Sequence, residues 1–334
     1  MEEQKTEPWQ EALRTFLNTF PEGPLGTETL DLHHVLGRIL AKQVPARIDT
    51  PPFSQALMEG FLVHVQDTTP ASAQSPVSLK ISGKIEPGRS EVPRFQNGEC
   101  LEVMTGSLAD TPKGETFAVA SFRDVQREGH QIRIQRPFQP FENIEMRGKE
   151  TRRGDTLLTQ GVRLYPEEIG LLAGQGILQV EVARRPVVAI FSSGNEVLSP
   201  PEPLSSGSVW DANSYSLSAF SEKCGGHPRF FGIMRDDPVS FQKALGKALT
   251  ECDMAVISGG TAAGGGNFIA DRVQAAGTPG IIINGVPMRS GKPLIMGVVG
   301  KKPIVCVAGY PPEALRGFNL FARPTIARLL GIPG

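Results

Sequence analysis

The chain is poor in cysteine and histidine, and neither residue type forms a disulfide or metal-binding pattern. Its 334 residues include four cysteines, Cys100, Cys224, Cys252 and Cys306, with no C-x-x-C pair among them. We therefore expect buried, reduced thiols. The adjacent pair His33-His34 would project about 100° apart on a helix, so it does not make an i,i+4 metal pair. No histidine-based metal site is expected.

Long hydrophobic runs and an excess of one charge are also missing. The longest apolar runs, such as 186–191 and 280–283, are too short to cross a bilayer. The N-terminal sequence MEEQK lacks the basic and apolar regions of a secretory signal. With 34 basic and 35 acidic residues the net charge is −1, which does not favour nucleic acid or an anionic membrane as a partner. A cytoplasmic protein that binds neither is expected.

The common nucleotide-binding motifs and the hydrolase nucleophile motif are absent. The stretch from Gly285 to Lys292 has the wrong spacing for a Walker A loop, and Pro293 stands in place of its hydroxyl residue. No G-x-G-x-x-G follows a predicted strand, and no G-x-S-x-G occurs. A P-loop enzyme, a dinucleotide-binding Rossmann enzyme and an α/β-hydrolase are therefore disfavoured.

What the chain does contain is a change of apolar periodicity along its length. Helical spacing predicts one helix around 9–20 and a second over 32–41, with Asp31 as the N-cap of the second. Short β-type runs separated by Pro, Gly and Asp follow between 51 and 137, which indicates a small all-β unit. A short helix is predicted over 161–174.

From about residue 185 onward, predicted strands alternate with predicted helices. The strands are expected at 187–191, 229–233, 254–258, 281–284 and 304–307, and the helices at 214–223, 239–251, from about 267, and at about 312–330. This alternation predicts an α/β domain with a largely parallel sheet.

The most informative local feature is the glycine-rich stretch SGGTAAGGGN, from Ser258 to Asn267. It follows a predicted strand and precedes a predicted helix. Such a turn presents free backbone N–H groups to an anion, and its glycines allow close approach. Ligands of parallel sheets bind at the carboxyl ends of strands, where turns at 192–196 and 309–313 are also expected. This stretch is therefore a candidate phosphate cradle, although it contains no carboxylate.

Short motifs follow one another in a fixed order along nearly the whole chain. They are LGRILA at 36–41, PPF at 51–53, MEGF at 58–61, GE at 98–99, MTG at 104–106, RG at 147–148, GD at 154–155, EIGLLA at 168–173, RPVVAIFSSGNE at 185–196, DANSY at 211–215, RDDP at 235–238, SGG at 258–260 and SGKP at 290–293. Each is weak alone. By their number and order the chain resembles the molybdopterin molybdotransferases, the MoeA/gephyrin family, with motifs such as PPFDNSAMDGYA and RPRVAILSTGDEL.

This resemblance implies an α/β plus β fold. It divides the chain into a helical linker and dimerisation domain at 1–48 and 138–184, an all-β domain at 49–137, and a three-layer α/β molybdopterin-binding domain with a mostly parallel sheet at 185–334. Members usually carry a fourth, C-terminal β domain, which is expected to be absent here. They are typically homodimers, with the active cleft between one subunit's α/β domain and the other's N-terminal region.

The resemblance also implies a reaction in which molybdenum is inserted into adenylylated molybdopterin. Molybdate is the second substrate, AMP is released, and Mg²⁺ assists. Motif matching carries over Glu59, Thr105, Glu196 and Asp237 as catalytic residues, and Glu196 and Asp236 as metal ligands. The substrate-binding residues carried over are Ser192, Ser193, Gly194, Asp211, Ser258, Gly259, Gly260, Asn267, Arg289, Lys292, Pro311 and Glu313. Other molybdenum-cofactor biosynthesis proteins are further candidate partners.

Several of these positions depart from the family pattern. Glu59 replaces an Asp, and Asn267 replaces an Asp after the glycine-rich loop, which removes a negative charge. Glu313 replaces a Ser at the start of the last predicted helix. A carboxylate there would repel molybdate if that helix N-terminus faces the anion. Arg289 replaces a Lys and keeps the positive charge.

Each transferred role also has a plain structural alternative. Thr105 suits a turn, Glu196 the first turn of a helix, Asp237 an N-cap before a proline, and Lys292 a solvated turn. Three functions therefore stay open. The chain is a molybdopterin molybdotransferase, a non-catalytic carrier or regulator that binds molybdopterin, or a gephyrin-like scaffold. The retained motif residues favour the enzyme.

Overall fold

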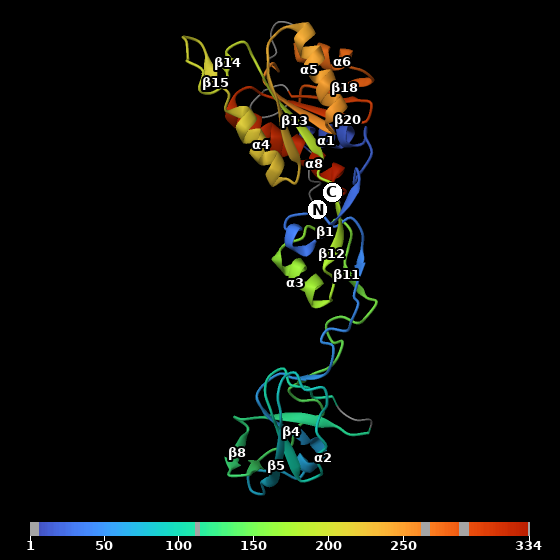
Figure 1. The fold of residues 1–334 in the computed structure, drawn as a ribbon, viewed down its shortest axis with the longest axis vertical. Helices are drawn as coiled ribbons and strands as arrows, with labels where there is room; N and C mark the ends of the chain where they lie inside the picture. Colours follow the sequence, from blue (N-terminus) through green and yellow to red (C-terminus); the bar gives the residue numbers. More distant parts are fainter. Residues whose placement is uncertain (1–6, 111–113, 262–267, 287–293, 333–334) are drawn as a thin grey trace. The chain divides into compact units, whose positions relative to one another are not determined.

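The computed structural model describes residues 7–110, 114–261, 268–286 and 294–332, and it divides the chain into two compact units (Figure 1). The first unit contains Met1–Lys42 and Thr159–Gly334, and the second contains Gln43–Leu158. The division into three domains at the boundaries given above stays a prediction. Within the described ranges, no helix is both long enough and apolar enough to cross a membrane.

A six-stranded sheet lies at the centre of the first unit, in the order β16-β13-β17-β20-β19-β18. The strands are β13 (Val187–Ser193), β16 (His227–Met234), β17 (Met254–Ser258), β18 (Pro279–Asn284), β19 (Ile295–Val299) and β20 (Lys302–Val307). The first four strands in that order are parallel, while β19 and β18 run antiparallel to their neighbours. The parallel arrangement expected of the sheet thus holds for four of its six strands, and the sheet as a whole is mixed. Strand β19 was not predicted from the sequence pattern.

Helices cover both faces of this sheet because its central strands are apolar on both sides. On β13, Val188 and Ile190 join one buried cluster while Ala189 and Phe191 join another. The first cluster is covered by α1 (Pro8–Leu17), α4 (Asn213–Lys223), α7 (Pro311–Gly317), a π-helical turn (Phe318–Ala322) and α8 (Arg323–Leu329), and the second by α5 (Pro238–Glu251) and α6 (Phe268–Ala275). The α/β part therefore has three layers (Figure 1).

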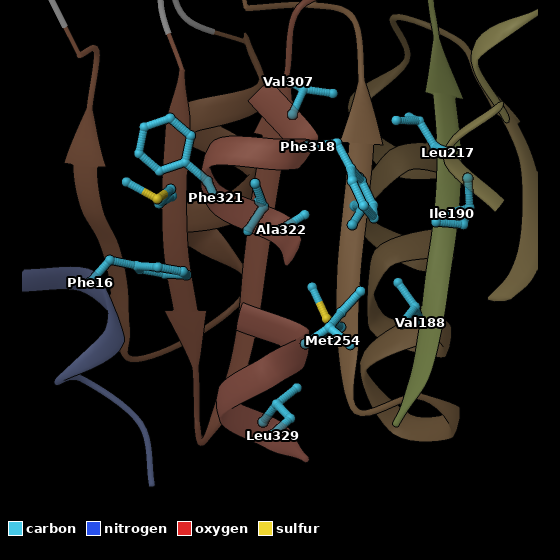
Figure 2. Packing of buried hydrophobic residues seen from close by; sticks show 14 of the residues in the cluster. Phe16, Val188, Ile190, Leu217, Met254, Val307, Phe318, Phe321, Ala322 and Leu329 are labelled. Atoms are coloured by element: carbon cyan, nitrogen blue, oxygen red, sulfur yellow. The ribbon is translucent and has the colours of Figure 1, made fainter. Parts of the chain in front are cut away.

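Aromatic side chains fill the first cluster. Phe318 and Phe321 from the π-helical turn and Phe16 from α1 are fully buried, and they belong to the same buried cluster as Val188 and Ile190 of β13 (Figure 2). Burying one such phenylalanine stabilises the fold by about 1.5–3 kcal/mol. This packing holds the N-terminal helix, the C-terminal helices and the central strands in one body, so the turns at the strand ends have a rigid support.

Smaller elements complete the first unit. Strand β1 (Thr27–Asp31) pairs antiparallel with β12 (Gln179–Ala183). The helix expected at 161–174 begins only at Pro166, as α3 (Pro166–Gly174), where proline occupies the first turn without losing a hydrogen bond.

The helix predicted over 32–41 is wrong. Only Leu32–His34 forms a short 3₁₀ helix, which the Asp31 side chain caps. Gly37 then adopts φ +74°, a left-handed conformation that ends a helix. Leu40 makes a β-bridge to strand β12 instead. The apolar spacing therefore belongs to a turn and an extended segment. They bury Leu32, Val35, Ile39 and Leu40, whereas Leu36 is exposed.

The second unit is built around another six-stranded sheet, in the order β7-β4-β6-β5-β9-β8. The strands are β4 (Gly60–His64), β5 (Val77–Ile85), β6 (Glu99–Val103), β7 (Phe117–Ser121), β8 (Val125–Glu128) and β9 (Gln131–Ile134). Only β5 and β6 pair in parallel. On β4, Phe61 and Val63 belong to one buried cluster and Leu62 to the other. The β character expected of this region is confirmed, apart from the one-turn helix α2 (Val65–Thr68).

Short strand pairs lie beside the two main sheets. In the second unit, β2 (Val44–Pro45) pairs with β11 (Thr156–Leu158), and β3 (Gln55–Ala56) pairs with β10 (Ile144–Glu145). In the first unit, β14 (Val197–Leu198) and β15 (Val209–Trp210) form a parallel pair directly after β13. This last pair matters for function, because it borders the carboxyl end of the central sheet.

Candidate functional site

The turns that follow three neighbouring parallel strands meet at one end of the first unit's sheet. Ser193 ends β13, Ser258 ends β17 and Gly309 follows β20. Two adjoining cavities lie here, with volumes of about 210 Å³ and 320 Å³, and both are lined by Ser193, Glu196 and Gly309. The carboxyl ends of parallel strands are where α/β proteins bind their ligands. This end of the sheet is therefore the candidate site.

The smaller cavity, called the Trp210 cavity below, has an apolar wall and a polar floor. The strand pair β14–β15 supplies the wall, with Val197, Val209 and the Trp210 indole. The floor is lined by Ser192, Ser193, Asp211, Asn213 and Ser258. Such a combination of a few polar groups with apolar and aromatic surface is typical of a small-molecule site.

Two hydrogen bonds fix the carboxylate of Asp211. Its Oδ1 accepts from the Ser192 hydroxyl at 2.7 Å and from the backbone N–H of Ser214 at 3.0 Å. Because α4 begins at Asn213, the second bond satisfies an N–H group that has no partner within the helix. The side chain is therefore held by the end of β13 and by the first turn of α4.

A second chain of hydrogen bonds connects the three turns. The amide Nδ2 of Asn213 donates to Ser258 Oγ at 2.7 Å and to the carbonyl oxygen of Gly309 at 2.8 Å. Ser258 Oγ in turn donates to the carbonyl oxygen of Ala308 at 3.1 Å. One side chain at the start of α4 thus ties the end of β17 to the turn after β20.

Three buried polar atoms on this floor have no hydrogen-bond partner in the described part of the chain. They are Ser193 Oγ, Asp211 Oδ2 and Asn213 Oδ1. Their residues are only 5%, 4% and 8% exposed. Leaving such an atom unpaired costs about 1–3 kcal/mol, and native proteins rarely do so. Their concentration in one cavity indicates that a ligand completes their hydrogen bonds.

The larger cavity, called the glycine-turn cavity below, lies against the turn after β17. Gly259 has φ +105°, and a Cβ atom there would lie 2.5 Å from the carbonyl oxygen of Ser193. Gly260 has φ +64°, and a Cβ atom there would lie 2.5 Å from the Ile269 side chain. Only glycine therefore lets this turn approach the turn after β13. The predicted phosphate cradle is described only as far as Thr261, and the backbone N–H of Gly259 already donates to Val307.

Two carboxylates line the glycine-turn cavity, those of Glu196 and Asp236. Asp236 is held by Asn195, whose Nδ2 donates to Oδ2 and whose Oδ1 accepts the Asp236 backbone N–H, both at 3.2 Å. In the described ranges, no three His, Cys, Asp or Glu side chains gather to hold a metal ion. Mg²⁺ is usually bound by one or two carboxylates with substrate phosphates and water. Glu196 and Asp236 fit such an ion, but not a cage built from protein alone.

Asp237 does not line either cavity. Its carboxylate caps α5 by accepting the backbone N–H of Ser240 at 2.8 Å. Hydrogen bonds from the side chain and from the backbone of Ser240 lower the pKa of Asp237 below its ordinary value. The structure therefore gives this carboxylate a helix-capping role, and its predicted part in catalysis stays untested.

The remaining predicted residues fall into three groups. Gly194 and Pro311 line the site, whereas Glu313 is half-buried in the first turn of α7, where its N–H donates to the Tyr310 carbonyl oxygen. Glu59 and Thr105 are exposed in the second unit. The predicted positions outside the described residues are Asn267, Arg289 and Lys292.

Among the lining residues that the motif comparison missed, four have a polar or aromatic side chain: Trp210, Asn213, Thr261 and Tyr310. Trp210 directly precedes the DANSY motif that contains Asp211, and Asn213 lies within that motif, so the sequence did point to their neighbourhood. An Asn at the start of a helix, next to a turn of the central sheet, is a reasonable candidate for hydrogen bonds that connect neighbouring turns. Nothing in the sequence, however, indicates which distant carbonyl group it would reach.

Comparisons with known proteins agree with this arrangement. The model of the MoeA N-terminal region (domain I and II) matches residues 7–176, and that of a probable molybdopterin binding domain matches residues 189–328. A molybdopterin molybdenumtransferase of Nostoc sp. is 32% identical over 309 residues, which cover 92% of this chain and 70% of that protein. Molybdopterin molybdenumtransferase 2 of Mycobacterium tuberculosis is 30% identical over 309 residues, covering 91% and 76%.

A solved structure agrees as well. The molybdopterin biosynthesis MoeA protein from Pyrococcus horikoshii superposes with a TM-score of 0.82 at 29% identity, over 99% of this chain and 81% of that chain. The matched regions include both units and the turns that carry the site. The chain therefore belongs to the MoeA family, the molybdopterin molybdenumtransferases of molybdenum cofactor biosynthesis.

Proposed function

We propose that the site at the carboxyl end of the first unit's sheet binds adenylylated molybdopterin and molybdate, inserts molybdenum into the pterin and releases AMP. The observation that carries this proposal is the pairing of two unlike cavities. One contains buried polar atoms without partners, and the other joins a glycine turn to two carboxylates. A substrate with a polar ring system and a phosphate group suits both.

The glycine-turn cavity is the proposed place for the phosphate end of the substrate. Gly259 and Gly260 leave no side chain between the backbone and a bound anion. When bound, Mg²⁺ would be held by Glu196 and Asp236 and would neutralise the phosphate charge. The protein's own contribution is to hold these carboxylates in place, which Asn195 does for Asp236.

The homodimer and the catalytic roles of Glu59, Thr105 and Asp237 are part of the same proposal, and they rest on the family resemblance. So does a cytoplasmic location. Association with other proteins of molybdenum cofactor biosynthesis also stays a proposal.

A second candidate function is a pterin carrier or regulator without turnover. The half-buried Glu313 in the first turn of α7 favours it, because Pro311 of the same turn lines the Trp210 cavity. A carboxylate near a molybdate site would repel the dianion, by about 4 kcal/mol at 4 Å in a medium of intermediate polarity.

The test is AMP release from adenylylated molybdopterin by the full chain with Mg²⁺, with and without molybdate. We expect molybdate-dependent release, and at least a tenfold loss in Glu196→Gln. The matched control is Glu251→Gln, which removes an exposed carboxylate paired with Arg229 at 2.8 Å in the same unit. Binding of the pterin without release would establish the carrier, and failure to bind it would remove both functions.

A further inference from the structure

We propose that the Trp210 cavity is the subsite for the pterin ring, which donates hydrogen bonds from its 2-amino and N3–H groups to Asp211 and Asn213 and stacks on Trp210. This inference rests on the proposed function, because it assigns one part of the same substrate to one of the two cavities. The evidence for it is the identity of the buried polar atoms in the cavity that lack a hydrogen-bond partner among the described residues.

The hydrogen-bond network determines which way the Asn213 amide points. Ser258 Oγ donates its proton to the Ala308 carbonyl oxygen, so it can only accept from Asn213. The Gly309 carbonyl oxygen is an acceptor as well. The Asn213 atom that faces both must be the NH₂ group, and the atom left without a partner must be the carbonyl oxygen Oδ1.

The Asp211 carboxylate likewise has one oxygen that is available to a ligand. Its Oδ1 already accepts two hydrogen bonds, from Ser192 and from the Ser214 N–H, while Oδ2 has none among the described residues. The cavity thus offers two buried acceptors, Asp211 Oδ2 and Asn213 Oδ1, with the Ser193 hydroxyl beside them. A complementary ligand must present neighbouring N–H donors.

This requirement separates the two ring systems of the substrate. A 2-amino-4-oxopteridine has two donor groups side by side, the 2-amino group and N3–H, and such a pair matches two separate acceptors, Asp211 Oδ2 and Asn213 Oδ1. Adenine has one amino group, flanked by ring nitrogens that only accept hydrogen bonds. Placed against the buried carboxylate of Asp211, one of these acceptors would face an acceptor. The floor of the cavity therefore favours the pterin over the adenine.

The wall of the cavity suits a flat ring. The indole of Trp210 is held by a hydrogen bond from its Nε1 to the carbonyl oxygen of Glu202, at 2.8 Å, yet the residue is 49% exposed. An anchored indole with an open surface provides a stacking platform at little cost in side-chain entropy. The cavity volume of about 210 Å³ is below the roughly 300–1,000 Å³ of pockets for drug-sized ligands. It suits one ring system rather than the whole adenylylated substrate.

The sharpest variant is Asp211→Asn. Because Oδ1 must keep accepting from Ser192 and Ser214, the new amide oxygen takes that place and the NH₂ group replaces Oδ2. An acceptor becomes a donor with no change of shape and no loss of an existing hydrogen bond. We expect the protein to fold normally and to bind 2-amino-4-oxopteridine about tenfold to a hundredfold more weakly.

Trp210 itself reports the binding. The chain has two tryptophans, so Trp9→Phe leaves Trp210 as the single indole. Titrating that variant with 2-amino-4-oxopteridine should quench its fluorescence, and adenosine should not. Trp210→Ala should weaken pteridine binding, measured calorimetrically, about fivefold or more. The control is Asp31→Asn, which changes a carboxylate that caps the 3₁₀ helix elsewhere in the same unit.

The inference is overturned if the pteridine fails to bind, if Asp211→Asn binds it as tightly as the unsubstituted chain, or if adenosine rather than the pteridine quenches Trp210. Failure of the proposed function looks different. Pteridine binding that depends on Asp211, without molybdate-dependent AMP release, would remove the enzyme and leave the ring subsite standing. Normal AMP release with unchanged pteridine binding in Asp211→Asn would remove the ring subsite and leave the proposed enzyme standing.

Discussion

The two units each contain a polar cavity, and in the larger of the two Arg136 is paired with two of the carboxylates that line it, whereas Glu59 and Arg123 line it as well. In the second unit, a cavity of about 600 Å³ is lined by Arg136, Asp124 and Glu142. Arg136 donates to Glu142 at 2.7 Å, lies 3.5 Å from Asp124 and stacks 4.0 Å above the ring of Phe138. In the Trp210 cavity, of about 210 Å³, three buried polar atoms have no partner among the described residues.

This difference indicates that buried polar atoms without a hydrogen-bond partner identify a ligand site better than the volume of the cavity does. A polar group that is buried and unpaired lowers stability, and a bound ligand can recover that free energy. A charged group paired within the fold has little left to offer a ligand. The network around Arg136 therefore has a structural role, whereas the floor of the Trp210 cavity is prepared for a ligand.

The largest effect that would test this comparison is expected at Gly259. Alanine there would place Cβ 2.5 Å from the Ser193 carbonyl oxygen at a φ of +105°, so the turns after β13 and β17 must separate. We expect a loss of about 3 kcal/mol or more in the free energy of unfolding. Urea unfolding followed by tryptophan fluorescence measures it, because both tryptophans, Trp9 and Trp210, lie in the first unit.

The matched control is Gly207→Ala. Gly207 also has a left-handed φ, +87°, but no atom lies within 4 Å of the added Cβ. Only backbone strain applies there, so the expected loss is about 1–2 kcal/mol. If both variants lose the same amount, the close approach at Gly259 contributes nothing and the turn is not held as the structure indicates.

A smaller effect compares two buried serines. Ser107 of the second unit accepts from the Met104 N–H at 3.2 Å and donates to the Ile85 carbonyl oxygen at 3.0 Å. The hydroxyl of Ser193 in the Trp210 cavity has no hydrogen-bond partner within the described part of the chain. Ser107→Ala should cost about 1–2 kcal/mol, because it leaves two buried groups unpaired. Ser193→Ala should leave stability unchanged or raise it by up to about 1 kcal/mol.

Tryptophan fluorescence reports the Ser193 variant, and hydrogen exchange of peptides from β5 and β6 reports the Ser107 variant in its own unit. A loss above about 1 kcal/mol in Ser193→Ala would mean that its hydroxyl is satisfied in solution. Asp211 Oδ2 and Asn213 Oδ1 would then be the two atoms on the cavity floor that lack a partner among the described residues.

The sequence predicted those parts of the fold that depend on neighbouring residues. The strand Met254–Ser258 was expected at its observed bounds, because a fully buried strand of a parallel sheet is a short apolar run that ends in a glycine turn. The segment 32–41 was predicted wrongly for the same reason. Its apolar spacing fits a helix, but Gly37 and the pairing of Leu40 with β12 depend on a partner strand far away in sequence.

The candidate site was predicted in the same uneven way. Ser192, Asp211 and Ser258 were identified by motif, and all three line the Trp210 cavity. Asn213 was missed although it lies two residues from Asp211. Its role depends on reaching Gly309, 96 positions along the chain. Which strand ends are neighbours, and therefore which atoms stay unpaired, follows from the strand order and not from local sequence.

The smallest effect concerns the paired network of the second unit and its dependence on pH. The hydrogen bond from Arg136 outweighs the opposing effect of burial and lowers the pKa of Glu142 below its ordinary value of 4.5. A lowered carboxyl pKa adds stability above the unfolded value, and this stability is lost as pH falls through the folded value. Arg136→Met should therefore cost about 0.5–1 kcal/mol at pH 7, since both side chains are partly exposed, and clearly less near pH 3.

Hydrogen exchange of the peptides around β7 at the two pH values, corrected for the intrinsic exchange rates, measures this difference. The control is Arg133→Met, whose partner Glu128 lies 3.3 Å away with a side chain that is 59% exposed, so its cost should be near zero at both pH values. Part of the Arg136 cost should persist at low pH, because the guanidinium stays charged and keeps its contact with the Phe138 ring. A cost that does not change with pH would assign the whole effect to that ring contact, and the carboxylates of this cavity would then be as free to bind a ligand as the atoms on the floor of the Trp210 cavity.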